Sequence, residues 1–318
     1  MHRSHRIALV IPAYREEKLI KPTLDAVPPL IDVIYVVDDH SPDNQNAVIA
    51  ACAARDKRIH LLEHPKNQGP GAAIITGYRK SSEDGNDITV VVGGDNQMSL
   101  HEIERFLDPL IDGKADYAKG NRFLMSQFDD TLAKMPMARL IGNWMITAVT
   151  KIASGFYKTM DVVDGYTAIT KRAIDAINWK KAWPGYGYPM DFLIRLNGYG
   201  FKLIEVPRTA VYTPGERQSQ IKGPRYFSRV APMLLRGFLW RLRFKYMYRD
   251  FHPLMFFFIM GFVLLPLGLL LSIDLTVKWL ITEGFVITGS RSILAALLII
   301  TGLQFLLFAM LFDMEEGK

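Results

Sequence analysis

The sequence has very little cysteine: Cys52 is the single one among 318 residues. An intrachain disulfide is therefore impossible, which fits a reducing compartment. The seven histidines show no spacing typical of metal ligands, so no histidine-based metal centre is expected. No apolar run precedes Ile7, and the stretch that begins there is too short for a signal peptide. There is no convincing internal repeat and no low-complexity segment.

Charged residues are absent from two long stretches near the C-terminal end, Pro253–Ile273 and Ser292–Phe312. A helix rises about 1.5 Å per residue, so each stretch would reach roughly 30 Å, the thickness of the hydrocarbon core of a bilayer. The sequence therefore predicts a two-helix transmembrane region over residues 251–318, with spans at about 253–273 and 292–312. Buried core helices are the alternative interpretation, but two such runs at one end of the chain favour spans.

Basic residues are concentrated before the first span, and this distribution says more than the net charge of +6. They are Arg225, Arg229, Arg236, Arg241, Arg243, Lys245 and Arg249. The loop between the spans has only two, Lys278 and Arg291. The positive-inside rule therefore predicts a multi-pass protein of the cell membrane, with the N-terminal domain and both termini in the cytoplasm.

Residues 225–250 are basic and aromatic, which predicts amphipathic helices that lie in the membrane interface. Four arginines fall on one side of such a helix and four apolar residues lie largely opposite: Arg225, Arg229, Arg236 and Arg243 against Phe227, Leu234, Phe238 and Leu242. Pro232 should break or kink the helix. A basic helix packed against the soluble domain is the alternative.

Residues 1–224 alternate apolar strands with polar helical segments, which is typical of a soluble α/β domain. Continuous β-branched runs at 7–11, 33–37 and 88–92 predict strands of a mostly parallel sheet buried on both faces. Helices are expected at about 17–27, 43–54 and 71–80. Ligands of such sheets bind at the carboxyl ends of the strands, so the residues that follow each run are the functional candidates.

Six motifs occur in order: IPAYREE, VVDDHSPD, NQGPGAA, GGDNQM, GNRF and DVVDGYTAIT. Together they resemble the inverting family 2 glycosyltransferases that use nucleotide-sugars, the family of dolichyl-phosphate mannose synthase and the bacterial polyprenyl-phosphate glycosyltransferases. The resemblance covers roughly residues 6–222. It implies a GT-A-like (Rossmann-like) catalytic domain, a nucleotide-sugar donor, a polyprenyl phosphate acceptor and a membrane location. No nucleic acid partner is expected, and a homo-oligomer is compatible with the sequence.

By this resemblance, the nucleotide-binding residues are Pro12, Ala13, Tyr14, Glu16, Asp38, Asp39 and Gly71. A carboxylate can accept the N–H groups of a base, which suits Asp39 supported by Asp38, and Glu16 can reach ribose hydroxyls. Loop acids that cap the next helix are the alternative for the two aspartates. A plain turn before a helix is the alternative for the segment around Gly71.

The GGDNQM motif is the expected site of Mg²⁺ or Mn²⁺, with Asp95 and Gln97 as ligands. The family usually has two aspartates here, separated by one residue, and Gly93 stands in place of the first. Water can fill the vacant position, because Mg²⁺ usually keeps several waters. A degenerate, inactive site is the alternative.

Acceptor phosphate binding is expected, by resemblance, from Arg122, Arg139, Asn143, Arg217, Ser219 and Lys222. The catalytic candidates are Asp95, Arg122 and Asp191, the last at the position of a general base in relatives with soluble acceptors. A lipid phosphate is already ionised, so Asp191 can orient a ligand instead of taking a proton. Asp161 and Asp164 belong to the same expected cleft, or to packing and turns.

Two other functions remain open. One is sugar transfer to a hydroxyl of a lipid-linked glycan; a processive synthase is a subcase, but the expected Gln-x-x-Arg-Trp segment is missing. The other is a non-catalytic membrane protein that binds nucleotide-sugars, which the absence of an aspartate at Gly93 would permit. The sequence does not distinguish the sugar, UDP from GDP, or dolichyl from undecaprenyl phosphate.

Overall fold

The computed structural model describes residues 1–123, 137–209 and 223–316, without the side chains of residues 137–141, 143 and 223–225. The chain divides into two compact units. The first comprises residues 1–154 and 158–238, and the second comprises residues 155–157 and 239–318.

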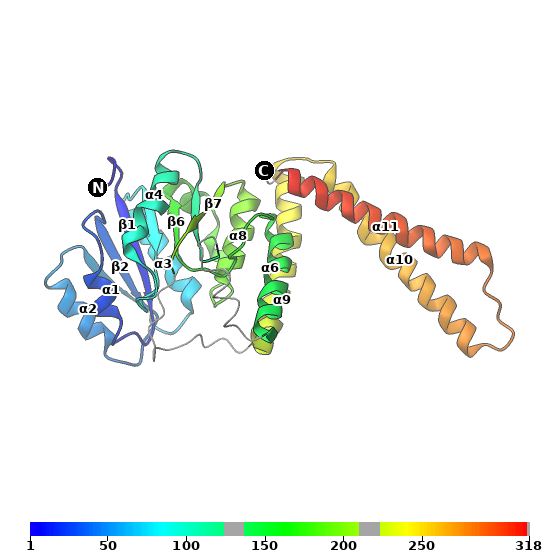
Figure 1. Cartoon of the computed structure of the whole chain (residues 1–318), viewed down its shortest axis with the longest axis horizontal. Helices are drawn as coiled ribbons and strands as arrows, with labels where there is room; N and C mark the ends of the chain where they lie inside the picture. Colours follow the sequence, from blue (N-terminus) through cyan, green and yellow to red (C-terminus); the bar gives the residue numbers. More distant parts are fainter. Residues whose placement is uncertain (124–136, 210–222, 317–318) are drawn as a thin grey trace. The chain divides into compact units, whose positions relative to one another are not determined.

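The first unit is built on one sheet, whose described strands have the order β3-β2-β1-β4-β6-β5-β7 (Figure 1). The strands are β1 Ile7–Ala13, β2 Val33–Asp38, β3 Ile59–Glu63, β4 Ile88–Val91, β5 Tyr117–Asn121, β6 Thr167–Thr170 and β7 Leu203–Pro207. All neighbours pair in parallel except β6, which is antiparallel to both β4 and β5. This mostly parallel sheet confirms the predicted α/β fold.

Helices connect the strands, and the first three lie at the predicted places. The helices are α1 Ile20–Asp25, α2 Gln45–Ala53, α3 Pro70–Glu83, α4 Ile103–Ile111, α6 Met137–Ser154, α7 Lys171–Ala176 and α8 Tyr188–Tyr199, with short 3₁₀ turns η1 Leu100–Glu102 and η2 Trp179–Lys181. The first three correspond to the predicted helices, although α1 and α2 are shorter. In the sheet, strand β1 lies between β2 and β4. The chain builds β2 and β3 on one side of β1 and then adds β4 on the other side.

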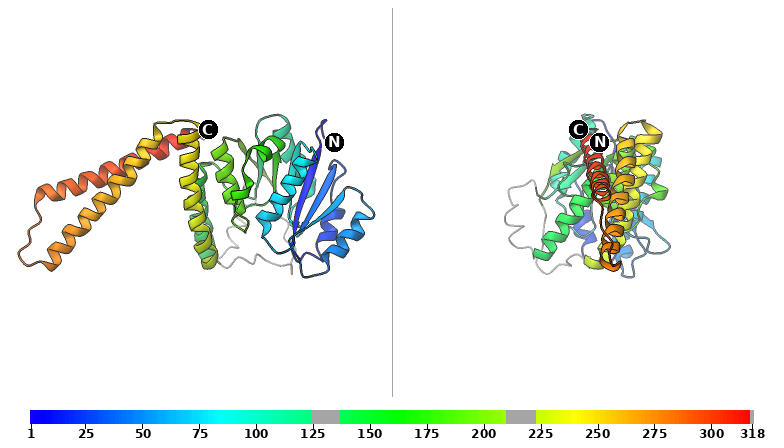
Figure 2. Two further views of the ribbon diagram at one scale, coloured as in Figure 1. Left: turned by 180° about the vertical axis from the view of Figure 1, so that it is seen from behind. Right: turned by 90° about the vertical axis from the view of Figure 1, so that its right-hand side faces the viewer.

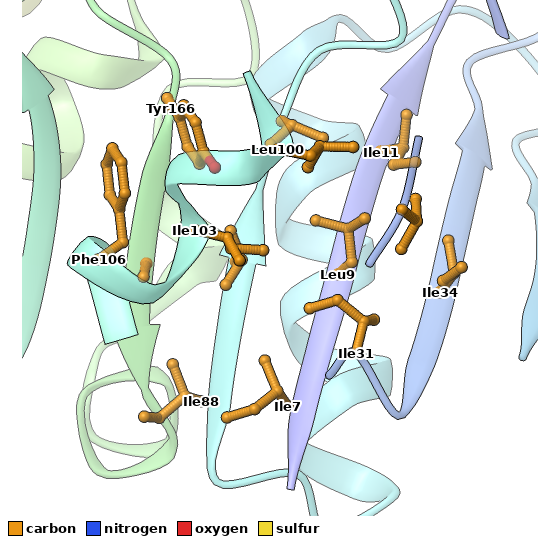
Figure 3. Close-up of a cluster of buried hydrophobic side chains, with 14 of the residues drawn as sticks. Ile7, Leu9, Ile11, Ile31, Ile34, Ile88, Leu100, Ile103, Phe106 and Tyr166 are labelled. Carbon is orange, nitrogen blue, oxygen red and sulfur yellow. The ribbon is translucent and has the colours of Figure 1, made fainter. Parts of the chain in front are cut away.

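The core explains why β1 is apolar along its whole length. Ile7, Leu9 and Ile11 of β1 lie in one buried cluster with Ile103 and other side chains of α4 (Figure 3). On the other face of the strand α3 comes very close, since a Cβ atom on its Gly77 would lie 2.3 Å from a methyl carbon of Val10. Both faces of β1 are therefore buried, as the continuous apolar run predicts.

The C-terminal part is helical: α9 Gly223–Arg243, a π-helical segment η3 Phe244–Arg249, α10 Leu254–Ile281 and α11 Gly289–Glu316. Helix α9 continues through Pro232, where the sequence predicts a break or kink. Helices α10 and α11 lie side by side as a hairpin (Figures 1 and 2). Both are long and apolar enough to cross a membrane. Gly302 allows their close approach, because a Cβ atom there would lie 2.5 Å from the backbone nitrogen of Leu265.

A buried ion pair holds the last turn of α11 within the second unit. Both side chains, Arg241 and Asp313, are fully buried. Arg241 donates through Nη1 and Nη2 to the two oxygens of Asp313, at 2.7 and 2.8 Å. The Tyr157 hydroxyl donates to the same carboxylate at 2.8 Å, and so does the Tyr246 hydroxyl. The end of α11 is therefore fixed to the end of α9.

Candidate active site

The carboxyl ends of β1, β2 and β4 lie next to one another, because these parallel strands are neighbours in the sheet. The loops that follow β1 and β2 are tied together by hydrogen bonds. The Arg15 N–H donates to Ser41 Oγ at 2.8 Å, and the Glu16 N–H donates to Gln45 Oε1 at 3.0 Å. Pro12, Tyr14 and Glu16 remain partly exposed at this edge, as a binding surface requires.

Asp38 holds the start of α2. It is 3 % exposed and accepts hydrogen bonds from the Ser41 N–H at 3.0 Å, from Asn46 Nδ2 at 3.2 Å and from Gln45 Nε2. Two of these donors are side-chain amides of the first turn of α2, and the third is a loop N–H, so Asp38 ties the loop to the helix without capping its backbone N–H groups. The carboxylate of Asp38 therefore supports the loop that bears Asp39.

Asp39 organises the next loop. Its two carboxylate oxygens accept the N–H groups of Gln68 and Gly69 at 2.8 and 2.7 Å. Oδ1 also lies 2.8 Å from His64 Nδ1, and the other ring nitrogen of His64 lies 2.9 Å from Thr76 Oγ1. A carboxylate offers about four acceptor positions, so capacity for the N–H of a base remains. The nucleotide role of Asp39 stays a prediction.

Gly71 makes room for neighbouring backbone. A Cβ atom there would lie 2.5 Å from the carbonyl oxygen of Trp183 and 2.9 Å from that of Pro184. The Ala72 N–H donates to the same Pro184 oxygen at 3.1 Å. The glycine therefore lets α3 begin against the segment before α8. Its predicted contact with a nucleotide is untested.

The loop after β4 presents the predicted metal ligands. Asp95 and Gln97 are partly exposed, and the Gln97 N–H donates to Asp95 Oδ1 at 3.2 Å. Gly94 brings this loop to the β1 loop, since a Cβ atom there would lie 3.5 Å from Pro12 O and from Glu16 Cγ. No cluster of three or more acidic, histidine or cysteine ligands occurs among the described residues. One carboxylate and one amide suit Mg²⁺, which takes its other ligands from water and substrate phosphates.

Arg122 follows β5 and is held by two buried carboxylates. Its Nε lies 2.7 Å from Asp161 Oδ2 and 3.3 Å from Asp164 Oδ2, and its Nη2 lies 2.9 Å from Asp161 Oδ1. Arg208 donates to Asp164 Oδ2 from Nε at 2.8 Å and from Nη2 at 2.6 Å. A longer bond of 3.5 Å joins Arg208 Nη1 to the carbonyl of Gln97. The loop after β4, which bears the predicted metal ligands, is thus connected to Arg122 through Asp164 and Arg208.

Lys119 and Glu205 complete this charge cluster. Lys119 is fully buried and donates to the carbonyl of Asp164. Burial lowers the pKa of Lys119, although Asp164 and Asp161 oppose the shift. Burial also raises the pKa of Glu205, whose carboxylate accepts from Asn121 Nδ2 at 2.8 Å. For Asp161, burial would raise the pKa, but the hydrogen bonds and charge of Arg122 outweigh it and lower that pKa.

The cluster includes residues that the sequence analysis does not single out. Lys119 is in β5 and Arg208 directly follows β7. A single basic residue at such positions is usually solvated. The signal in the sequence is that Lys119 stands directly before GNRF, after Tyr117 and Ala118. His64, the partner of Asp39, is likewise an isolated histidine after β3.

Asp191 is in the first turn of α8 and is 5 % exposed. Its Oδ2 accepts from Arg195 Nε at 2.7 Å and from the Trp183 N–H at 2.8 Å. Arg195 also donates to the carbonyl of Lys181. Asp191 and Arg195 therefore fix the segment that approaches Gly71. The role of Asp191 toward a ligand stays a prediction.

Three of the six predicted acceptor phosphate ligands lie outside the described residues, and two more lack a described side chain. Arg217, Ser219 and Lys222 belong to the segment 210–222. Arg139 and Asn143 are in helix α6, whose backbone is described there without these two side chains. Arg122 is the member of the group that the structure places.

The family model described as Glycosyl transferase family 2 matches residues 8–177. The chain is 29% identical over 220 residues to a UDP-N-acetylglucosamine–dolichyl-phosphate N-acetylglucosaminyltransferase of Methanococcus voltae, an alignment that covers 65% of this chain and 86% of the relative. It is 33% identical over 215 residues to an undecaprenyl-phosphate mannosyltransferase of Micrococcus luteus, covering 65% and 84%.

The fold is similar to that of a solved enzyme. Glucosyl-3-phosphoglycerate synthase from Mycobacterium tuberculosis, crystallised with Mg²⁺ and uridine diphosphate, superposes with a TM-score of 0.53. The match covers 75% of this chain and 79% of that chain at 16% identity. At this identity the likeness concerns the fold alone, and it agrees with the predicted GT-A-like architecture.

Proposed function

Because the chain belongs to glycosyl transferase family 2, we propose that it transfers a sugar, with inversion, from a UDP- or GDP-linked donor to a polyprenyl phosphate at the cytoplasmic membrane face. The chain is a glycosyltransferase. The names of two relatives support a lipid phosphate acceptor, since one acts on dolichyl phosphate and the other on undecaprenyl phosphate. Helices α10 and α11, long and apolar enough to span a membrane, agree with such an acceptor.

The donor would bind at the carboxyl ends of β1, β2 and β4. Its nucleotide would lie between the β1 loop, with Pro12, Tyr14 and Glu16, and the loop that Asp39 organises. Asp95 and Gln97 would hold Mg²⁺ or Mn²⁺, which when bound supplies positive charge to the pyrophosphate. That charge would offset the negative charge that develops on the nucleoside diphosphate, and so would favour the transition state over the bound substrate.

The proposed step is a single displacement. An oxygen of the ionised lipid phosphate forms a bond to the anomeric carbon while the bond from that carbon to the pyrophosphate breaks. The nucleoside diphosphate leaves with the electron pair, and no proton has to be removed. Attack opposite the leaving group converts an α-linked donor into a β-linked product.

The burial and hydrogen bonds of Asp191 favour a phosphate acceptor over a hydroxyl acceptor. A hydroxyl must lose a proton as it attacks, which requires a base within hydrogen-bond reach. Asp191, at the expected place of that base, is buried and already accepts from Arg195 and from the Trp183 N–H. A carboxylate that stabilises its own loop in this way suits an acceptor that needs no base.

Positive charge for the acceptor would come from several arginines and lysines. Lys119, Arg122 and Arg208 face three acidic side chains, Asp161, Asp164 and Glu205, so the described cluster has no surplus of cations. Arg139, Arg217 and Lys222 would supply that surplus, with bidentate guanidinium contacts to the phosphate.

The test compares Asp191→Asn with Arg139→Ala in sugar transfer to a polyprenyl phosphate. We expect Arg139→Ala to be the more damaged, because a misplaced acceptor oxygen can cost about 100-fold in rate. Arg55→Ala, at an exposed arginine after α2, is the control. The hydroxyl-acceptor alternative requires the reverse order, with Asp191→Asn nearly inactive for want of a base.

A further inference from the structure

His64 is a buried polar residue to which the proposed reaction assigns no role. It directly follows β3, and its side chain is 6 % exposed. Its backbone N–H donates to the carbonyl of Asp38 at 2.9 Å. Its ring joins two other segments, because Nδ1 lies 2.8 Å from Asp39 Oδ1 and Nε2 lies 2.9 Å from Thr76 Oγ1 of α3. These three contacts fix the orientation of the imidazole ring.

The partner atoms determine which ring nitrogen of His64 carries the proton. An ionised carboxylate only accepts hydrogen bonds, so Nδ1 donates to Asp39. In the neutral ring Nε2 is then the acceptor, and the hydroxyl of Thr76 can donate to it. The second hydrogen bond of a histidine generally sets its tautomer in this way. Thr76 therefore favours the tautomer that places a donor against Asp39.

Asp39 uses three of its acceptor positions on donors from the described residues. Oδ1 accepts from His64 Nδ1 and from the Gln68 N–H, both at 2.8 Å, and Oδ2 accepts from the Gly69 N–H at 2.7 Å. A carboxylate offers about four positions, two on each oxygen. Oδ1 is therefore fully used, and about one position remains on Oδ2.

The backbone around Asp39 keeps this arrangement in place. Gly69 has a φ of +96°, which glycine adopts readily, and a Cβ atom there would lie 2.6 Å from the carbonyl oxygen of Pro184. The Asp39 N–H donates to the carbonyl of Ala13 at 3.0 Å. Asp38 is no substitute acceptor, because its carboxylate holds the start of α2. The position on Oδ2 is therefore the acceptor that this pair of aspartates presents from the side of the β3–α3 loop.

We propose that, within the proposed donor site on which this inference rests, His64 is a positioning residue for base recognition. It holds the carboxylate of Asp39 so that a single acceptor position faces the base, which selects uracil over guanine. The pairing edge of uracil has one N–H between two carbonyl groups. That of guanine has two adjacent donors, N1–H and the amino group, which a carboxylate binds with one oxygen each.

The fully used Oδ1 distinguishes the two bases. Guanine would place its second donor against an oxygen whose positions are already taken by His64 and Gln68. A buried donor without an acceptor lowers affinity by roughly 10- to 100-fold. Cytosine is disfavoured for another reason, because its N3 is an acceptor and would face the oxygen of a carboxylate. Of these three bases, uracil is the one whose single donor matches the position on Oδ2.

The test measures the binding of UDP, GDP and CDP to the full-length chain in detergent micelles, by isothermal titration calorimetry with excess Mg²⁺. Two substitutions separate the ring nitrogens of His64. In His64→Asn the amide nitrogen takes the place of Nδ1 and can still donate to Asp39. In His64→Gln the amide reaches the place of Nε2, next to Thr76, and no longer donates to Asp39. His60→Gln, at an exposed histidine of β3, is the matched control.

We expect UDP to bind at least about 10-fold more tightly than GDP or CDP. His64→Gln should lower the ratio of UDP affinity to CDP affinity by about 10-fold, because the carboxylate of Asp39 loses the donor that holds it toward N3–H. His64→Asn and His60→Gln should keep that ratio. A purely structural role of His64 would weaken both nucleotides equally and leave the ratio unchanged, and that result would overturn the proposal. An equal fall of the ratio in His64→Asn and His64→Gln would overturn it too.

The comparison of the three nucleotides on the unchanged chain needs no variant to fold. GDP or CDP binding as tightly as UDP would overturn the inference. It would leave the proposed sugar transfer to a lipid phosphate intact, because that reaction does not depend on the base. Binding of none of the three nucleotides would overturn the inference together with the proposed donor site.

Discussion

Replacing Asp313 by leucine should destabilise the second unit strongly. In the structure the carboxylate accepts two bonds from Arg241, at 2.7 and 2.8 Å, one from the Tyr157 hydroxyl at 2.8 Å and one from the Tyr246 hydroxyl. Asp313→Leu removes all four acceptors and leaves the guanidinium of Arg241 buried without its counter-charge. Breaking a buried pair from one side costs about 3–5 kcal/mol.

A double substitution of Arg241 and Asp313 tests whether the loss of stability comes from leaving one buried charge without its partner. Arg241→Met alone should cost about as much as Asp313→Leu, because it leaves the carboxylate unpaired. Combining Arg241→Met with Asp313→Leu should recover most of the loss, because replacing a buried pair with apolar residues is often close to neutral. Tyr157→Phe should cost only about 1 kcal/mol, the net contribution of one hydrogen bond.

The measurement is resistance of the full chain to heat or denaturant in detergent micelles, with Asp274→Leu as the matched control. Asp274 is also an aspartate of the helical hairpin, but it pairs with Lys278 at 2.8 Å while both side chains are about half exposed. Such a pair contributes about 0–1 kcal/mol. If Asp313→Leu is no worse than Asp274→Leu, or the double variant is no better than the singles, the buried pair does not stabilise the unit as argued.

Three further predictions concern the site and the membrane. Asp95→Ala, or EDTA on the unchanged chain, should lower activity by about 100-fold or more, because charge stabilisation at the leaving group is lost; full activity in either case would contradict the metal role. Gly93→Asp should leave Mg²⁺ affinity in equilibrium dialysis equal or higher, although its Cβ would come 2.9 Å from Asp95 Oδ1, so that side chain must shift; weaker binding would count against the ligand assignment. A cysteine reporter in the loop between the two predicted spans should be labelled from outside the cell, and labelling only after permeabilisation would reverse the topology.

The sequence predicted the parallel part of the sheet well. The strands β1, β2 and β4 are continuous apolar runs, and their burial on both faces is a local consequence of that composition. Because parallel neighbours bring their carboxyl ends together, Glu16, Asp38 and the Asp95 loop could be placed at one edge from the sequence alone. The structure confirms this arrangement of the strands.

The contacts within the site could not be predicted, because they join distant segments. Arg208 contacts Asp164, which lies 44 residues earlier in the chain. Between them in sequence is the antiparallel strand β6, which is inserted between β4 and β5, and nothing in its own four residues indicates that position. Gly71 is next to a motif that suggests a nucleotide, yet the backbone of Trp183 alone explains the glycine. Asp39 likewise gains a histidine partner, His64, which no spacing rule indicates.

The most direct test of the central claim is the structure of the lipid product. Purified full-length chain would be given a panel of α-linked UDP- and GDP-sugars with undecaprenyl phosphate or dolichyl phosphate, and with the matched polyprenol as control. We predict a glycosyl phosphate whose anomeric proton and carbon couplings in NMR show the β configuration, formed from the phosphate and not from the polyprenol. An α-linked product, or transfer only to a hydroxyl acceptor, would contradict the account.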